Sequence, residues 1–153
     1  MTPYQCLDPY DWAALLALIQ TEFAFMQGRI DPPSSMLRLT AEALAAQSRT
    51  AEIWAIGHPP HACVILTPKA DALYIGKLAV AADHRRKGLA RALIDLAESR
   101  ARALGLPGLE LETRVELVGN QATFVALGFV ETARTAHPGY DRPTSITYRR
   151  AVD

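Results

Sequence analysis

The stretch from Leu73 to Gly105 constrains the fold more than any other part of the chain, because it predicts a strand, a basic turn and a helix in that order. Leu73–Val80 is a short apolar run, and residues 84–88 read His-Arg-Arg-Lys-Gly. Beyond this turn, apolar residues recur at three- and four-residue steps, which indicates a helix with one buried face. Gly105 stands where a helix C-terminus favours a residue that adopts positive φ. The apolar positions are Leu89, Leu93, Leu96 or Ala97, Ala101 and Leu104.

The turn has the features of an anion-binding site. A helix N-terminus leaves four backbone N–H groups unpaired and carries about half a positive charge. Gly88 removes a side chain where a ligand approaches the backbone, and three cationic side chains precede it. A diphosphate is the ligand that fits several N–H groups at once. The spacing matches neither a P-loop nor a Gly-x-Gly-x-x-Gly fingerprint.

Residues 85–90 read Arg-Arg-Lys-Gly-Leu-Ala and fit the pattern Arg/Gln-x-x-Gly-x-Gly/Ala. After the strand end Leu78-Ala79-Val80, this stretch resembles the pyrophosphate loop of the GNAT N-acetyltransferases. Residues 127–129, Leu-Gly-Phe, resemble a late motif of the same family, and two motifs in the right order are more specific than either alone. The resemblance implies acetyl-coenzyme A as co-substrate, with its pyrophosphate held by Arg85, Arg86, Lys87, Gly88, Leu89 and Ala90.

The remaining segments are consistent with this fold class. We expect strands at residues 3–7, 52–57, 61–67, 109–115, from residue 129 and at 144–150, and further helices at 9–28, from 41 and at 121–127. Asp8, Thr40 and Asn120 are placed to cap these helices. The order resembles the GNAT fold, an α/β (α+β) architecture with a mixed, mostly antiparallel sheet of about six to seven strands, four flanking helices and splayed parallel strands at the acetyl-CoA site. We expect one domain over residues 1–153.

Composition narrows the class of partner. Sixteen basic and sixteen acidic residues give a net charge of zero, which disfavours a general nucleic-acid binder using the Arg85–Lys87 patch. No apolar run has the length of a membrane span, and the N-terminus lacks a signal-peptide pattern. The two cysteines, Cys6 and Cys63, suit a reducing compartment. We therefore predict a cytoplasmic protein with no membrane and no nucleic-acid partner.

Acetyl transfer to an amine requires a polarised thioester carbonyl, a neutral amine and a protonated leaving thiolate. The resemblance implies that a backbone N–H of Leu78, Ala79 or Val80 polarises the carbonyl and that this strand lies beside the coenzyme. Many family members place a tyrosine as the leaving-group acid where this chain has Phe124. Tyr140, in the loop at 137–144, and Tyr74 are replacement candidates. Ordinary loop and packing roles are the alternatives for the two tyrosines.

Other polar residues are candidates with a structural alternative beside each. Asn120 is either a coenzyme contact beside Phe124 or a helix N-cap, since the family's usual asparagine position is Leu117 here. Glu112 could relay a proton from the amine through water, or Glu110 and Glu112 could simply alternate on the solvent-facing side of their strand. In the loop at 28–35, Arg29 and Asp31 could bind a carboxylate and an ammonium of the acceptor, or could be solvated charges. No histidine belongs to a metal-ligand cluster.

We therefore predict an acetyl-CoA-dependent N-acetyltransferase that transfers an acetyl group to a primary amine directly within a ternary complex. The alternative is a coenzyme-A-binding module or acyl-CoA sensor with little catalysis, which the absence of a tyrosine at Phe124 keeps open. The acceptor, a small molecule or a peptide, cannot be chosen because acceptor loops vary among GNAT enzymes. Whether the chain forms a homodimer is also left open.

Overall fold

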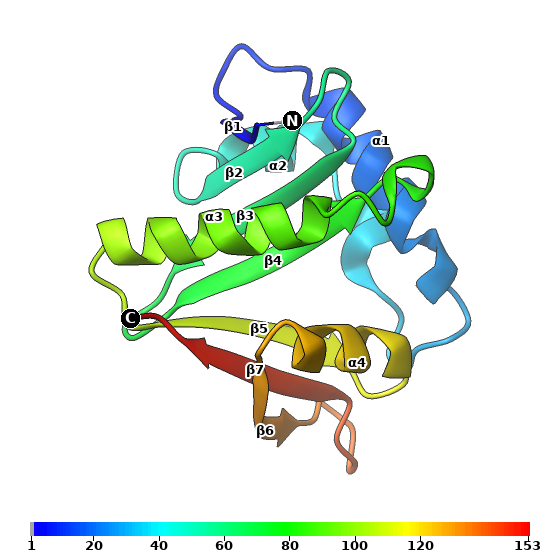
Figure 1. Cartoon of the computed structure of the whole chain (residues 1–153). Coiled ribbons are helices and arrows are strands. Elements are labelled where there is room, and N and C mark those ends of the chain that lie inside the picture. Colours follow the sequence, from blue (N-terminus) through cyan, green and yellow to red (C-terminus); the bar gives the residue numbers. More distant parts are fainter. Residues whose placement is uncertain (1) are drawn as a thin grey trace.

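The computed structural model describes residues 2–153, in which seven strands form one sheet in the order β1-β2-β3-β4-β5-β7-β6 (Figure 1). All neighbouring pairs are antiparallel except β4 and β5. The expected mixed, mostly antiparallel sheet is therefore confirmed. The strands are β1 (Tyr4–Gln5), β2 (Glu52–Ile56), β3 (Ala62–Pro68), β4 (Leu73–Val80), β5 (Gly108–Arg114), β6 (Val130–Thr135) and β7 (Ser145–Ala151).

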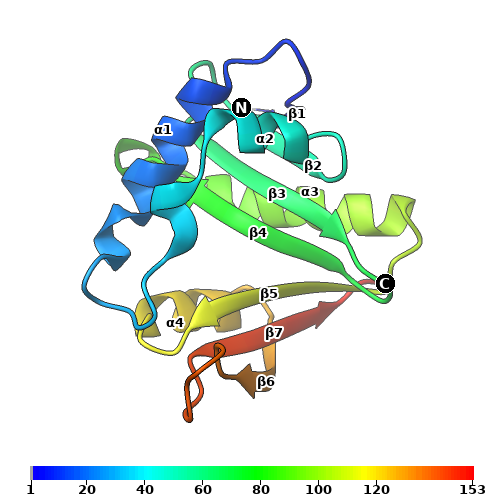
Figure 2. The same ribbon diagram turned by 180° about the vertical axis from the view of Figure 1, so that it is seen from behind.

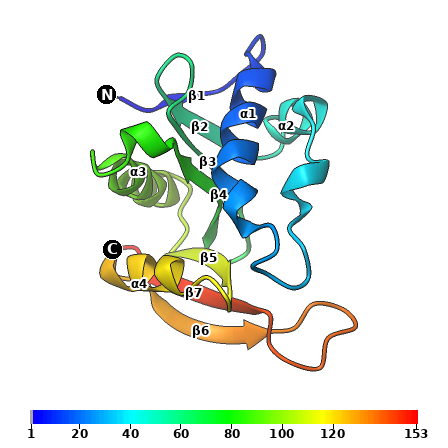
Figure 3. The ribbon, with the colours of Figure 1, turned by 90° about the vertical axis from the view of Figure 1, so that its right-hand side faces the viewer.

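Four α-helices cover the two faces of this sheet, with α1 and α2 on one side and α3 and α4 on the other (Figure 3). A buried apolar cluster lies on each face. Leu93, Ile94 and Ala97 of the long helix pack on one face, and Leu15 and Ile19 of the first helix pack on the other. Within residues 2–153, no helix is long and apolar enough to cross a membrane. The helices are α1 (Trp12–Phe23), α2 (Ala41–Gln47), α3 (Leu89–Ala103) and α4 (Val118–Ala126), with short 3-10 turns η1 (Ala24–Met26), η2 (Ser35–Arg38) and η3 (Ala82–His84).

The start of α1 differs from the expected one. Asp11, not Asp8, is the N-cap, and its carboxylate accepts a hydrogen bond from the Ala14 amide at 3.0 Å. Asp8 instead accepts a hydrogen bond from the indole N–H of Trp12 at 2.7 Å. The helix also ends at Phe23, before the predicted end, because the chain tightens into η1 there.

Two expectations for polar residues near β5 are wrong. α4 begins at Val118 with Leu117 in the cap position, so Asn120 lies inside the first turn and is not the N-cap. Glu110 does not face solvent, because its side chain is buried and accepts hydrogen bonds from Lys69 and Arg149 at 2.8 and 2.6 Å. The alternation along β5 places Glu110 on the face that was expected to be exposed to solvent, but Lys69 and Arg149 cover that face at this position.

The central feature of the sheet is the opening between β4 and β5. These strands are parallel, and among residues 2–153 they pair only at Leu73↔Leu109 and Tyr74↔Glu110. Past these two pairs the strands diverge, as the view from behind shows (Figure 2). The expected splayed parallel neighbours are therefore confirmed. Their divergence leaves the backbone of both strand ends without a strand partner on the inner side.

Candidate active site

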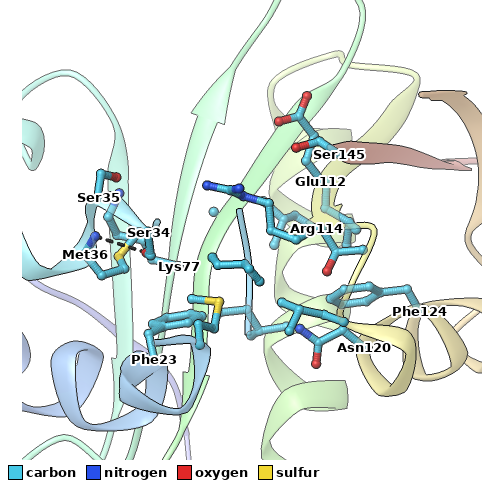
Figure 4. A pocket seen from close by; sticks show the side chains of 18 of the residues that line it. Phe23, Ser34, Ser35, Met36, Lys77, Glu112, Arg114, Asn120, Phe124 and Ser145 are labelled. Carbon is cyan, nitrogen blue, oxygen red and sulfur yellow. Dashed lines mark hydrogen bonds between the residues drawn. The ribbon is translucent and has the colours of Figure 1, made fainter. Parts of the chain in front are cut away.

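A cavity of about 320 Å³ occupies the opening between β4 and β5 (Figure 4). The segment between α1 and α2 closes one side, and α4 closes the other. Figure 4 shows Ser34, Met36 and Lys77 on one side of the cavity and Asn120 and Phe124 on the opposite side. The wall includes Phe23, Met26, Ile30, Ser34, Met36, Tyr74, Gly76, Lys77, Leu78, Leu111, Glu112, Thr113, Arg114, Asn120, Phe124, His137 and Ser145.

The predicted site residues divide into those on this wall and those away from it. Tyr74, Leu78, Glu112, Asn120 and Phe124 line the cavity. The remaining strand candidates continue β4 beyond it. The candidates from the two loops lie outside it, with Arg29 and Asp31 exposed and Tyr140 partly exposed. These outlying residues are Ala79, Val80, Arg29, Asp31 and Tyr140.

The strand β4 carries a bulge at the cavity. Gly76 pairs with Ile65 and Ala79 pairs with Cys63, so two β4 residues oppose one residue of β3. The extra residue is Lys77, whose φ of +48° bends the strand. The Lys77 carbonyl accepts a hydrogen bond from Cys63 Sγ at 3.5 Å. Because a trans peptide directs its N–H opposite to its carbonyl, the amide of Leu78 points away from Cys63.

Two predicted catalytic side chains, Tyr74 and Glu112, lie on the wall of this cavity. Burial, with a smaller contribution from the carboxylates of Glu112 and Glu110, raises the pKa of Tyr74 to about 12. Tyr74 is therefore a neutral phenol near pH 7, which can donate a proton or a hydrogen bond but cannot act as a base. Glu112 accepts a hydrogen bond from the Thr147 hydroxyl at 3.4 Å.

Tyr140 is engaged elsewhere. Its hydroxyl donates a hydrogen bond to Asp31 Oδ1 at 2.5 Å, and Arg142 forms an ion pair with Asp31 Oδ2 at 3.0 Å. The hydrogen bond to Asp31 is the main reason that the pKa of Tyr140 is raised. The structure thus brings together the two loops that the sequence singled out. It joins them to each other on the surface, and Pro32 links them to β5.

That link depends on Arg114, a residue that sequence reasoning did not single out. Its Nη1 donates a hydrogen bond to the Pro32 carbonyl at 2.7 Å. The amide of Asp31 donates to Glu116 at 3.1 Å, which secures the same loop. Lys77 was also missed. Neither residue belongs to a motif, and only the bulge and the splayed strands place both on one cavity wall.

At the N-terminus of α3, the backbone forms an open cradle. Gly88 precedes the helix at φ +77° and Arg86 has φ +64°, while no side chain caps the helix. A Cβ at position 88 would meet no atom within 4 Å, so the space above the first amides is free. Arg85 is tied to Glu22 of α1 at 2.7 Å, and Arg86 and Lys87 are exposed. Successive N–H groups beside cationic side chains can hold a phosphate.

Phe124 presents its ring to the cavity from α4. The ring packs edge-on against Phe129 with centroids 6.2 Å apart, and it also approaches Tyr148. Phe124 therefore contributes an apolar wall and has no proton to donate. Within residues 2–153, no three His, Cys, Asp or Glu side chains cluster in a way that could hold a metal ion.

Solved structures with the same fold include several acetyltransferases. The ribosomal-protein-S18-alanine N-acetyltransferase of Escherichia coli has a TM-score of 0.71 at 22% identity, over 99% of this chain and 93% of that one. A GNAT acetyltransferase of Staphylococcus aureus Mu50 has a TM-score of 0.75 at 15% identity, over 99% of both chains. A predicted streptothricin acetyltransferase of Bacillus anthracis, in complex with acetyl coenzyme A, has a TM-score of 0.60 at 20% identity, over 67% of this chain and 62% of that one.

No curated protein sequence matches this chain. The sequence model of the acetyltransferase (GNAT) family, however, matches residues 14–129, which extend from α1 to the Leu-Gly-Phe motif. The matched region contains the bulged strand, the cationic turn, the splayed pair and α4. The expected acyltransferase class is thereby confirmed at the level of the family. This chain belongs to the GNAT acetyltransferase family.

Proposed function

We propose that this protein transfers the acetyl group of acetyl-CoA to a primary amine, directly and within a ternary complex. The observation that carries the proposal is that a strand bulge, a cavity and a helix N-terminus adjoin one another. The bulge of β4 lies on the wall of the cavity at the splayed strands, and the uncapped N-terminus of α3 follows it within residues 77–90. Together they provide a site for a carbonyl, a site for an amine and a site for a diphosphate.

The residues at the α3 N-terminus fit the coenzyme. The open space above Gly88 admits a phosphate against the backbone, and the side chains of Arg86 and Lys87 supply positive charge. From there β4 runs toward the cavity with its inner edge unpaired past Tyr74. An extended arm containing amide groups can hydrogen-bond to such an edge in place of a strand. The acetyl-CoA bound to the Bacillus anthracis protein of the same fold supports this assignment.

When bound, acetyl-CoA supplies a thioester whose carbonyl carbon is attacked by the amine nitrogen. In our proposal the Leu78 amide donates a hydrogen bond to the carbonyl oxygen as negative charge develops there. Glu112 accepts the proton lost by the amine, through a water molecule. The C–S bond then breaks, and Tyr74 donates a proton to the departing sulfur, the role that Phe124 cannot fill. Ala79 and Val80 would line the arm of the coenzyme, and Asn120 and Phe124 its reactive end.

We further propose that the protein acts in a reducing compartment, the cytoplasm. Cys6 and Cys63 are both buried and unpaired. Burial raises the pKa of the Cys6 thiol to about 11 and that of Cys63 to about 12, so neither is a reactive thiolate at neutral pH. This supports direct transfer to the amine, without an acyl-cysteine intermediate.

Thermal unfolding with acetyl-CoA tests the coenzyme assignment, with ATP and NAD as phosphate-bearing controls. Ligand at about one hundred times its dissociation constant should add roughly 2.7 kcal/mol, which raises Tm by several degrees. A shift specific to acetyl-CoA is the expected result, and an equal shift with ATP would reduce the loop to a general anion site. Release of free CoA thiol in the presence of amines then separates an enzyme from an acyl-CoA sensor.

A further inference from the structure

The acceptor side of the cavity carries an excess of positive charge. Leu109 and Leu111 of β5 pack into the cluster under α3, so Glu112 and Arg114 alternate to the opposite face of the sheet, toward α1. Figure 4 shows the Arg114 guanidinium extending from β5 toward the side where Lys77 lies. Two cations thus face one carboxylate, Glu112, across a small cavity.

Neither cation has an ion-pair partner in the described part of the chain. Within residues 2–153, no carboxylate lies within ion-pair distance of Lys77 or Arg114. Nine of the other Arg and Lys side chains, such as Arg149 and Arg100, have such partners. Lys77 is half-buried, and burial lowers the pKa of its ammonium. Arg114 uses one N–H for the Pro32 carbonyl and retains others in its fork. A half-buried cation without a partner costs free energy, which a bound anion would offset.

A second cavity of about 320 Å³ adjoins this face. It shares the side chains of Phe23, Met26, Ile30, Ser34 and Met36 with the first cavity. The rest of its wall comes from Gln20, Gln27, Gly28, Pro33 and Leu37. No charged side chain of the described chain lines it, and most of the lining is apolar. An acceptor that reaches into this cavity is therefore expected to do so with an apolar group.

We infer that the acceptor is a small α-amino acid with an apolar side chain, whose carboxylate binds between Lys77 and Arg114. This inference rests on the proposed function. Lys77 directly precedes Leu78, whose amide we assign to the thioester carbonyl. A carboxylate held by Lys77 therefore lies near the reacting carbonyl. This fits an α-amino acid, whose carboxylate is only a few bonds from its attacking nitrogen. The amine is left beside Glu112, and the side chain extends between Met26 and Met36. A cavity of this size, at the low end of ligand sites, suits a small molecule.

The test compares matched amines in an assay of CoA thiol release. Leucine, methionine and phenylalanine are each paired with their carboxamide and with the corresponding decarboxylated amine, and a short peptide amide serves as the polypeptide arm. We expect the free amino acids to have kcat/KM values about tenfold or more above those of their neutral partners, as for a charged hydrogen bond. Preference for neutral amines or for the peptide would overturn the inference.

Substitutions of Lys77 and Arg114 test whether these side chains bind the acceptor carboxylate. Lys77→Met and Arg114→Gln should each raise KM for the amino acids about tenfold, while the thermal shift with acetyl-CoA stays at the wild-type value. For the decarboxylated amines, KM should not change. Lys77→Arg should restore most of the preference, which separates charge from backbone strain at the bulge. Arg38→Gln, an exposed arginine on η2, is the matched control and should behave as wild type.

The outcomes distinguish the two proposals. Absence of both an acetyl-CoA shift and thiol release with any amine contradicts the proposed function itself. A wild type that binds acetyl-CoA but acetylates none of the amino acids overturns only the acceptor inference. Equal losses for charged and neutral amines in Lys77→Met would likewise overturn it, because the lysine would then act on the reaction and not on the carboxylate.

Discussion

Tyr74 and Phe124 differ by one hydroxyl, and that hydroxyl decides which of them can donate a proton in the cavity. Tyr74→Phe should lower kcat by about a hundredfold or more, the usual contribution of an acid or base, with the acetyl-CoA shift unchanged. Tyr140→Phe is the matched variant. Its hydroxyl is bound to Asp31 outside the cavity, so kcat should stay near the wild-type value. A larger loss in Tyr140→Phe than in Tyr74→Phe would return the acid role to the surface loop.

Two buried threonines make opposite predictions for stability. Thr113 Oγ1 is buried without a hydrogen-bond partner, whereas the hydroxyl of Thr144 is bonded to the His137 amide at 2.9 Å and to the His137 ring. Thr113→Val removes an unsatisfied polar atom and should raise the free energy of unfolding by about 1 kcal/mol. Thr144→Val should lower it by a similar amount. Urea unfolding measures both, and a destabilised Thr113→Val would show that the hydroxyl is satisfied in solution.

At the scale of an element, the two ends of α3 permit a controlled test of the anion cradle. Gly88 and Gly105 have nearly equal φ values, +77° and +71°, and a Cβ at either would meet no atom within 4 Å. Glutamate should therefore cost about 1–2 kcal/mol of backbone strain at both positions. Only Gly88→Glu places a carboxylate against the proposed pyrophosphate. It should abolish the acetyl-CoA shift, and Gly105→Glu should retain it. Loss of the shift in both variants would mean that strain alone is responsible.

Strand and helix order could be predicted from the sequence because periodicity and turn residues are local. Leu73–Val80 has the predicted bounds, and the anion turn precedes α3 as expected. Capping was less predictable, since Asp8 and Asp11 are both capable N-caps and only the path of the chain into Trp12 selects one. Glu110 was misjudged because its partners, Lys69 and Arg149, come from distant segments. Lys77 and Arg114 could not be found from sequence for the same reason: a bulge and a splay bring them to one wall.

At the scale of the whole molecule, paired carboxylates set the response to acid. Hydrogen bonds from Arg100 lower the pKa of Glu52. Burial alone would raise the pKa of Glu110, but hydrogen bonds from Lys69 and Arg149 outweigh it and lower the value. A carboxyl with a lowered folded pKa stabilises the fold above its unfolded pKa, near 4.3, and loses that contribution as the pH falls through the folded value.

The contribution of these carboxyl groups to stability should therefore fall steeply below about pH 4 and change little between that pH and neutrality. Thermal unfolding across this range measures the effect. Glu110→Gln should be less stable than the wild type near neutral pH, and the two should converge in acid, because the wild-type carboxyl is then also neutral. Parallel curves at all pH values would mean that the Glu110 charge contributes nothing to this dependence.

Only two residue pairs join β4 to β5 in the described chain, so the sheet consists of two halves with a narrow connection. Along the sheet, β1–β4 and β5–β7 are connected through these pairs alone in the described chain. An extended molecule bonded to both free edges would span the opening as a missing strand does, and would brace one half against the other. Ligand binding would then stabilise parts of the sheet that are far from the ligand itself. When the ligand is bound, amide hydrogen exchange should slow along the inner edges of both strands, because the ligand then stabilises the sheet as one of its own strands would.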